Sequence, residues 1–217
     1  MIKLTKQPEP QVLRDNGPQW LKVLQDRVAA SKAPTSTETS RYNNPEIKAA
    51  LRLETHDKCA YCESCLTHIT YGDIDHISPK SVKLEDTFRW SNLTLACDVC
   101  NTKKGKEIDI VDPYIDEPND LFRFAGAIMF AKPNKGIAKR TLHRLDLNRT
   151  ELMQRRVKRL NAIWSILHVI EIATDPLEKQ AAIDELFETE TADSAEYAAS
   201  VRQFLAHVAP HLQATTV

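Results

Sequence analysis

The sequence predicts a mainly α-helical protein of the α+β class, in which a small irregular core is followed by a helical C-terminal lobe. Three observations support this. Only 5 of the 217 residues are glycine and 6% are aromatic, which argues against a β-sandwich or a barrel. Turn residues interrupt the segment 59–112. Most of the chain after Ile137 has the three- and four-residue apolar spacing of helices.

Residues 1–45 are predicted to form an N-terminal arm. A helical pattern begins at Pro18 and continues to Val28, and residues 31–42 are predicted to be a loop. Asn44 followed by Pro45 is typical of a helix start, because asparagine caps the first turn and proline fits its first position. A short helix should therefore end near Asp57.

Residues 46–116 are predicted to be the core of the molecule. A hairpin-like segment is expected from Leu66 to Ile77, and a helix should run on from Cys97.

Residues 117–217 are predicted to form the mostly helical lobe. It should begin with a strand pair around Gly126. A helix of about seven turns should follow, because one apolar stripe recurs at helical spacing. This stripe consists of Leu152, Val157, Leu160, Ile163, Trp164, Leu167 and Ile170. Because such a face needs a partner, we expect the lobe either to pack on the core or to dock another protein.

The chain begins without an apolar leader, so a cytoplasmic location is expected. The most apolar stretch, 162–173, is far shorter than the roughly 20 residues that cross a bilayer, so no membrane association is expected. The formal net charge is −1. Since nucleic-acid affinity depends on cationic side chains that neutralise phosphates, this chain alone should bind nucleic acid weakly.

Five cysteines fall in one segment, and four of them form two Cys-x-x-Cys pairs. The ligand set is Cys59, Cys62, Cys97 and Cys100. Two such pairs predict a tetrahedral Zn²⁺ site that is closed to water and therefore structural. Cys65 is predicted to be a spare thiol.

The stretch between the two cysteine pairs carries Asp73-Ile-Asp-His-Ile-Ser-Pro-Lys-Ser81 and Asn92-Leu-Thr-Leu, and Asn101 follows the second pair. These residues resemble the HNH nuclease family. In that family a histidine at the end of a β-hairpin, an asparagine in the loop and a His or Asn on the next helix form a ββα-metal motif between zinc knuckles. The resemblance implies a ββα-metal (HNH) core and hydrolysis of nucleic-acid phosphodiester bonds.

The resemblance also implies a role for each motif residue. His76 would be the general base, and Asp75 and Asn101 would hold a catalytic Mg²⁺ or Mn²⁺ ion. Asn92 would position His76. Asp73 is an alternative ligand to Asp75. Nearby lysines are candidates for contacts with flanking phosphates, namely Lys80, Lys83, Lys103, Lys104 and Lys106.

The layout is more narrowly similar to the PtuB-like HNH effectors of Septu-type anti-phage defence systems, some of which accompany retrons. This similarity covers the arm, Lys58-Cys-Ala-Tyr-Cys-Glu63, the segments 73–81 and 92–97, and the helical lobe. It implies an ABC-type or SMC-like ATPase (PtuA-like) as a partner, and a retron reverse transcriptase with its DNA as further candidates.

Three alternatives remain open. The substrate could be RNA, for example tRNA, because this chemistry requires no particular sugar. The knuckles could instead belong to a non-catalytic zinc-binding interaction module. A free-standing restriction or homing enzyme would need its own DNA-reading domain, and no helix-turn-helix or extended basic region is found in the sequence.

Overall fold

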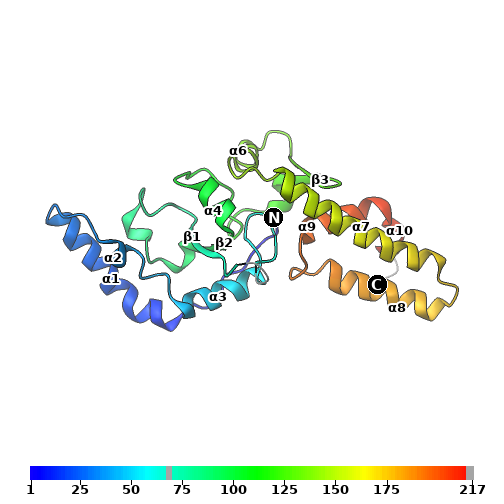
Figure 1. Ribbon diagram of the computed structural model, residues 1–217, viewed down its shortest axis with the longest axis horizontal. Helices are drawn as coiled ribbons and strands as arrows, with labels where there is room; N and C mark the ends of the chain where they lie inside the picture. Colours follow the sequence, from blue (N-terminus) through cyan, green and yellow to red (C-terminus); the bar gives the residue numbers. More distant parts are fainter. Residues whose placement is uncertain (67–69, 214–217) are drawn as a thin grey trace.

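The computed structural model describes residues 1–66 and 70–213. The molecule is elongated, with a helical arm at one end, a helical lobe at the other and the small β-sheet between them (Figure 1). The chain runs through α1 (Gln11–Ala29), α2 (Ser36–Thr39), α3 (Pro45–Thr55), β1 (Asp73–His76), β2 (Leu93–Ala96), α4 (Asp98–Lys104), α5 (Pro118–Leu121), β3 (Phe122–Ala125), β4 (Ile128–Ala131), α6 (Gly136–Arg144), α7 (Thr150–Ile172), α8 (Pro176–Glu185), α9 (Ala198–Val208) and α10 (Pro210–Gln213). The predicted fold class, mainly helical with small sheets, is confirmed.

The N-terminal arm differs from its prediction in two places. Helix α1 begins at Gln11, so Pro18 lies inside the helix rather than at its start. The predicted loop contains α2, because Thr35 and Glu38 form a reciprocal capping box. The start of α3 is confirmed, since the Asn44 side chain accepts a hydrogen bond from the backbone N–H of Glu46.

The central sheet is made by two strands that are distant in sequence. Strand β1 pairs antiparallel with β2, with Asp75 opposite Thr94 and His76 opposite Leu93. The predicted hairpin within 66–77 is therefore wrong for its described residues; residues 67–69 lie outside them. The connection 77–92 contains 3-10 turns at Leu84–Asp86 and Trp90–Asn92 instead of one tight turn. It can therefore carry side chains around His76.

Two glycine-dependent turns frame the strands. Gly72, directly before β1, has a φ of +67°, and a Cβ there would lie 2.8 Å from the side chain of Leu66 and 3.0 Å from that of Leu95. The second sheet, β3 paired with β4, turns at Gly126 with a φ of +58°. The strand pair predicted around Gly126 is confirmed, and so is the helix that follows Cys97.

Helix α7 confirms the long helix but corrects part of its apolar stripe. Val157 and Trp164 are 46% and 57% exposed. Arg156 is buried in place of Val157, where its Nη1 donates to the carbonyl of Leu147 at 2.8 Å. Its guanidinium also lies over the Phe124 ring. These partners offset the cost of burying the Arg156 charge. Arg156 therefore occupies the buried position that the apolar spacing had predicted for Val157.

The described residues form a main apolar cluster around the cysteines and a separate cluster in the lobe. The lobe cluster is made by α7, α8, the π-helical turn Leu186–Glu190, α9 and α10. The main cluster also contains Phe122, Met129 and Leu152 from beyond residue 116, so the boundaries at 45/46 and 116/117 stay predictions. No helix in the described part of the chain is both long and apolar enough for a membrane span.

The residues just before α9 contact the turn that carries the first cysteine pair. Lys58 Nζ donates to the carbonyl of Ala195 at 2.7 Å, and the hydroxyls of Ser64 and Tyr197 lie 2.9 Å apart. The backbone N–H of Cys65 donates to a Glu196 carboxylate oxygen at 3.0 Å. The first cysteine turn is thus tied to residues 195–197.

Candidate functional site

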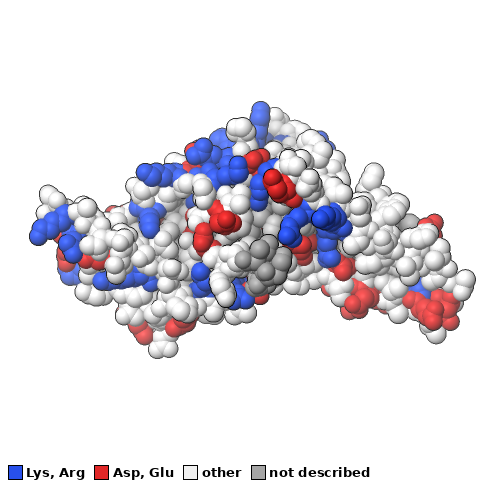
Figure 2. All heavy atoms as spheres, in the orientation of Figure 1, with Lys and Arg blue, Asp and Glu red and all other residues white. Residues whose placement is uncertain are grey.

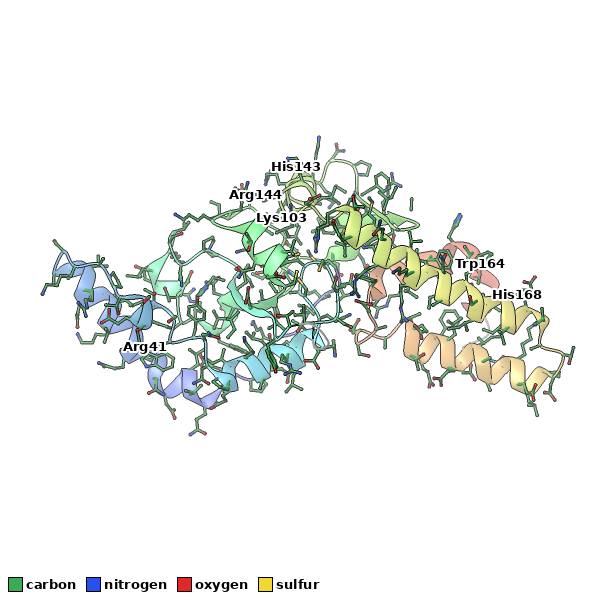
Figure 3. The ribbon with its side chains drawn as sticks, viewed as in Figure 1. Arg41, Lys103, His143, Arg144, Trp164 and His168 are labelled. Atoms are coloured by element: carbon green, nitrogen blue, oxygen red, sulfur yellow. The ribbon has the colours of Figure 1, made fainter. Side chains whose placement is uncertain are left out.

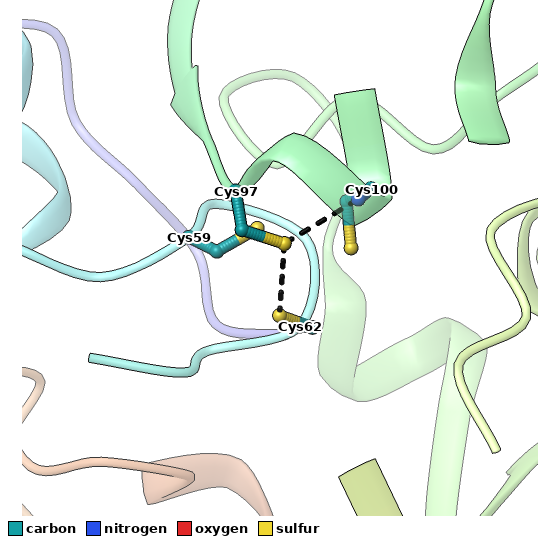
Figure 4. Close-up of side chains that lie close together, drawn as sticks. All are labelled: Cys59, Cys62, Cys97 and Cys100. Atoms are coloured by element: carbon teal, nitrogen blue, oxygen red, sulfur yellow. Dashed lines mark hydrogen bonds between the residues drawn. The ribbon is translucent and has the colours of Figure 1, made fainter. Parts of the chain in front are cut away.

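The four predicted ligand cysteines form one buried cluster. Their sulfur atoms all lie within 4.8 Å of one another, and the Cys62 and Cys97 sulfurs are 3.9 Å apart (Figure 4). Four thiolates at about 2.3 Å from a tetrahedral Zn²⁺ would be roughly 3.8 Å apart, so the cluster fits zinc. Cys97 caps α4, which also carries Cys100, and Cys59 and Cys62 lie in the turn after α3. Four thiolates leave no open coordination position, which fits a structural ion.

An arginine lies beside the cluster. Arg149 Nη1 is 3.9 Å from the Cys100 sulfur. Burial lowers the pKa of Arg149, but the negative charges of Cys100, Cys62 and Cys97 raise it by more, so the pKa is above its ordinary value. Four thiolates around a Zn²⁺ ion would carry a net charge of −2, which this guanidinium would partly balance. Cys65 is not among the clustered sulfurs, in keeping with a spare thiol.

His76 is held in one orientation at the end of β1. Its side chain is buried, and its Nε2 lies 2.9 Å from the backbone carbonyl of Thr87. Because a carbonyl only accepts, Nε2 must carry the proton, and Nδ1 keeps a free lone pair. The Tyr42 ring packs edge-on against the imidazole at 4.5 Å between centroids. Burial outweighs the Thr87 bond and lowers the pKa of His76 to about 4, so the ring is neutral at pH 7.

Asn92 fastens the connection that surrounds His76. Its side-chain oxygen accepts from the backbone N–H of Ser78 at 2.7 Å. Its amide nitrogen donates to the carbonyls of Ser78 at 2.9 Å and Asp86 at 3.0 Å. Both ends of the 77–92 connection are thereby joined, next to the end of β1.

Asp75 is buried between a tyrosine and a lysine. Its Oδ2 accepts from the Tyr61 hydroxyl at 2.6 Å, and its Oδ1 lies 3.2 Å from Lys104 Nζ. Burial raises the pKa of the Asp75 carboxyl, although Lys104 and Tyr61 act in the opposite direction. Lys104 is fully buried and also donates to the carbonyl of His76. The prediction that Lys104 contacts phosphate is therefore wrong, because its ammonium is buried and already bonded to Asp75 and to the His76 carbonyl.

Asn101 faces the same strand but contacts a different carboxylate. Its side-chain nitrogen donates to Asp73 Oδ2 at 3.1 Å, at the exposed edge of the site. Asp75, the other carboxylate on this strand, is held by Tyr61 and Lys104. Asp73, Asp75 and Asn101 together supply carboxylate and amide oxygens, which are ligands that suit a hard cation such as Mg²⁺.

Three contributors to this site carry no motif signal in the sequence. Tyr61 sits within the first cysteine pair, where its spacing indicated only a zinc turn. Tyr42 lies outside the motif, and Thr87 acts through its backbone, which has no sequence signal. The structure thus adds Tyr61, Tyr42 and Thr87 to the surroundings of Asp75 and His76.

Known proteins support the same assignment. Residues 59–107 match the family model described as HNH endonuclease. The Septu protein PtuB of Bacillus thuringiensis is 29% identical over 143 residues, covering 64% of this chain and 54% of the relative. The Septu protein PtuB of Bacillus mycoides (strain KBAB4) is 25% identical over 201 residues, covering 73% of this chain and 66% of the relative.

The chain thus spans between about half and two thirds of the length of these relatives. The matched segment 59–107 contains both cysteine pairs, His76 and Asn101, which the structure brings into one compact region. Residues 59–107 therefore form an HNH endonuclease domain, and the chain is similar to the Septu PtuB proteins.

Proposed function

We propose that this chain is the nuclease component of a Septu-type anti-phage system and that it hydrolyses phosphodiester bonds of DNA. The observation that carries the proposal is the hydrogen bond from His76 to the Thr87 carbonyl. This bond fixes the proton on Nε2 and leaves Nδ1 as a base. The same segment, which matches the HNH endonucleases, also supplies the carboxylates of Asp73 and Asp75 and the amide of Asn101.

Each polar residue of the site has a role in this proposal. His76 Nδ1 accepts the proton of the attacking water, while Asn92 and Tyr42 keep the imidazole in place. Asp75 and Asn101 would hold the Mg²⁺ or Mn²⁺ ion, with Asp73 as the alternative carboxylate. When bound, this ion would neutralise charge that develops on the leaving oxygen. The zinc cluster holds β2 and α4 so that these groups stay together.

Plasmid nicking tests this function. In Mg²⁺ or Mn²⁺, His76→Ala should lose about 10²- to 10⁴-fold in rate, the range that a general base contributes. His168→Ala is the matched control, because His168 is exposed on α7. Equal nicking by His76→Ala and wild type would exclude this mechanism. Parallel reactions with duplex DNA and tRNA decide the substrate, and cleavage of tRNA alone would replace DNA in the proposal.

The lobe supports the docking of an ATPase partner. A groove of about 400 Å³ is lined by Trp164, Leu167 and Val208, among others. Figure 3 marks Trp164 on α7, and its ring lies edge-on to that of Phe204 on α9 at 6.0 Å between centroids. Exposed apolar side chains continue along α7 to Val169 and Ile172. Exposed apolar surface beside a groove often marks a site where another protein binds, which favours a protein interface here.

Co-purification with the ATPase of the same system tests this second part. Trp164→Glu should abolish co-purification, because it places a charge in the apolar groove. Leu53→Glu is the control, since Leu53 is 69% exposed on α3, away from the lobe. Equal recovery of the ATPase with both variants would remove the lobe as the docking surface.

A further inference from the structure

We propose that the exposed face of α6 binds the phosphate backbone of duplex DNA. This α6 basic face comprises Lys135, Lys139, Arg140 and Arg144, all exposed. It lies outside the segment that matches the HNH endonucleases. The proposal rests on the nuclease function and adds a place where the chain itself grips its substrate.

The packing of α6 forces this face outward. Ala138 and Thr141 are buried on the opposite side of the helix. The Thr141 hydroxyl accepts a hydrogen bond from the backbone N–H of Val111 at 2.8 Å, which fixes the helix to the segment after α4. The basic side chains therefore stand on a fixed helix, so binding need not order the backbone that carries them.

Ion pairs join the α6 basic face to α4, the helix that carries Asn101. Lys103 on α4 pairs with Asp146, just after α6, at 3.0 Å. Arg144 pairs with Glu107, just after α4, at 3.1 Å. Figure 3 places Lys103, Arg144 and His143 along the same edge of the molecule. A DNA backbone on this edge would have to cross only α4 to reach the Asn101 side.

The width of one helix, α4, is small compared with the length of a DNA duplex. A helix with its side chains is about 10–12 Å across, and duplex DNA carries one charge per about 1.7 Å of its axis. Several phosphates can therefore lie over α4 and α6 at once. Figure 2 shows Lys and Arg side chains gathered over α4 and α6, whereas acidic side chains gather at the far end of the lobe.

The charges of the face are largely free to meet phosphates. Within the part of the chain that the structure describes, Lys135 and Lys139 have no ion-pair partner. Arg140 pairs with Asp109 at 3.6 Å, and both side chains are more than half exposed. Ion pairs this exposed contribute little to stability, so a phosphate can replace the carboxylate.

The chemistry of the face favours a duplex over a single strand. Proteins that bind single strands stack bases on aromatic rings. The exposed side chains of α6 and its N-cap include lysine, arginine and histidine but no Phe, Tyr or Trp. The formal net charge of −1 describes the whole chain. Three carboxylates at this edge pair with Lys103, Arg140 and Arg144, so Lys135 and Lys139 supply its excess positive charge within the described residues.

Anisotropy of a labelled DNA duplex tests the proposal in a His76→Ala background, so that the duplex stays intact. Lys135→Glu with Lys139→Glu is compared with Lys32→Glu plus Lys179→Glu, which changes the charge equally near α1 and on α8. The α6 pair should weaken binding about 10- to 100-fold and reduce the log–log salt slope by about two, because two phosphate contacts are lost. The Lys139→Arg variant should bind like its parent.

Two outcomes overturn the proposal. One is an α6 pair that binds DNA within about twofold of the control pair, which would leave an acidic protein as the partner of this face. The other is a loss confined to a labelled RNA hairpin measured in parallel. Zinc content and thermal unfolding verify that each variant is folded. Plasmid nicking by wild type and His76→Ala judges the nuclease function separately, because binding is measured without cleavage.

Discussion

The HNH core and the C-terminal lobe are stabilised in different ways. The core has two four-residue strands and a seven-residue helix, and it buries Asp75, His76, Asn92 and Lys104. The lobe is built on a 23-residue helix around Leu160, Ile163, Leu205 and other apolar side chains. Buried polar groups cost free energy unless they are paired. The core thus combines an apolar cluster with buried polar groups and four cysteines that could hold zinc, whereas the lobe depends mainly on apolar area.

Loss of zinc should have the largest effect on stability, because it should unfold the core but not the lobe. Structural zinc contributes on the order of 10 kcal/mol of folding free energy, so Cys59→Ser or a strong chelator should unfold the core. Helices α7 and α8 should keep most of their protection in hydrogen exchange, because their cluster contains no cysteine. Cys65→Ser is the control and should keep one zinc per chain. A folded core without zinc would contradict the cysteine assignment.

The buried pair of Asp75 and Lys104 should give the next largest effect. Asp75→Asn leaves the Lys104 ammonium buried without its counter-charge, which should cost about 3–5 kcal/mol in the free energy of unfolding. Denaturant unfolding measures this cost. Adding Lys104→Met to Asp75→Asn should recover most of the stability, because the unpaired charge is then removed.

Asp73→Asn is the matched control for Asp75→Asn. Asp73 is exposed, so its substitution should change stability by less than about 0.5 kcal/mol. The same two variants discriminate between the candidate metal ligands. If Asp73→Asn raises the Mg²⁺ requirement for nicking and the stability-matched Asp75→Asn/Lys104→Met variant does not, Asp73 is the ligand.

A cavity in the lobe should destabilise the lobe without affecting zinc. Ile163 is completely buried, and Ile163→Ala should cost about 2–5 kcal/mol. Val169→Ala, on the exposed side of the same helix, should cost little. Hydrogen exchange resolves which cluster opens. Loss of zinc from Ile163→Ala would show that the two clusters unfold together.

Removal of the Tyr42 ring should have the smallest effect on stability. An edge-on aromatic pair is worth about 0.5–1.5 kcal/mol, so Tyr42→Leu should lower the unfolding free energy by about that amount. It should slow nicking by more than this loss of folding stability accounts for, because the His76 ring can then change its orientation. Tyr42→Phe keeps the ring and should retain activity. Equal rates for Tyr42→Leu and wild type would exclude the positioning role.

The contrast also explains what the sequence could predict. The cysteine spacing and the cap at Asn44 are local chemical signals, and both predictions agree with the structure. The pairing of β1 with β2 depends on a long connection, so no turn signal marks it. Lys104 looks like a surface lysine in sequence, because its burial depends on Asp75 from another element.

Similar reasons explain the errors in the lobe. Apolar spacing identified α7, but it could not tell that Arg156 finds carbonyl and ring partners inside. Trp164, which the same spacing predicted to be buried, is more than half exposed. Of the α7 positions where the pattern fails, Trp164 is the one that lines the groove proposed for docking.

The tie between Lys58 and Ala195 has a consequence for the order of events during synthesis. These residues are 137 positions apart, a stretch that takes roughly 7 to 27 s to translate at about 5–20 residues per second. All four cysteines have been made well before the backbone carbonyl that receives Lys58 exists. We expect a nascent chain to gather its four cysteines early and to reach the final packing of its first cysteine turn only after residue 195 has left the ribosome.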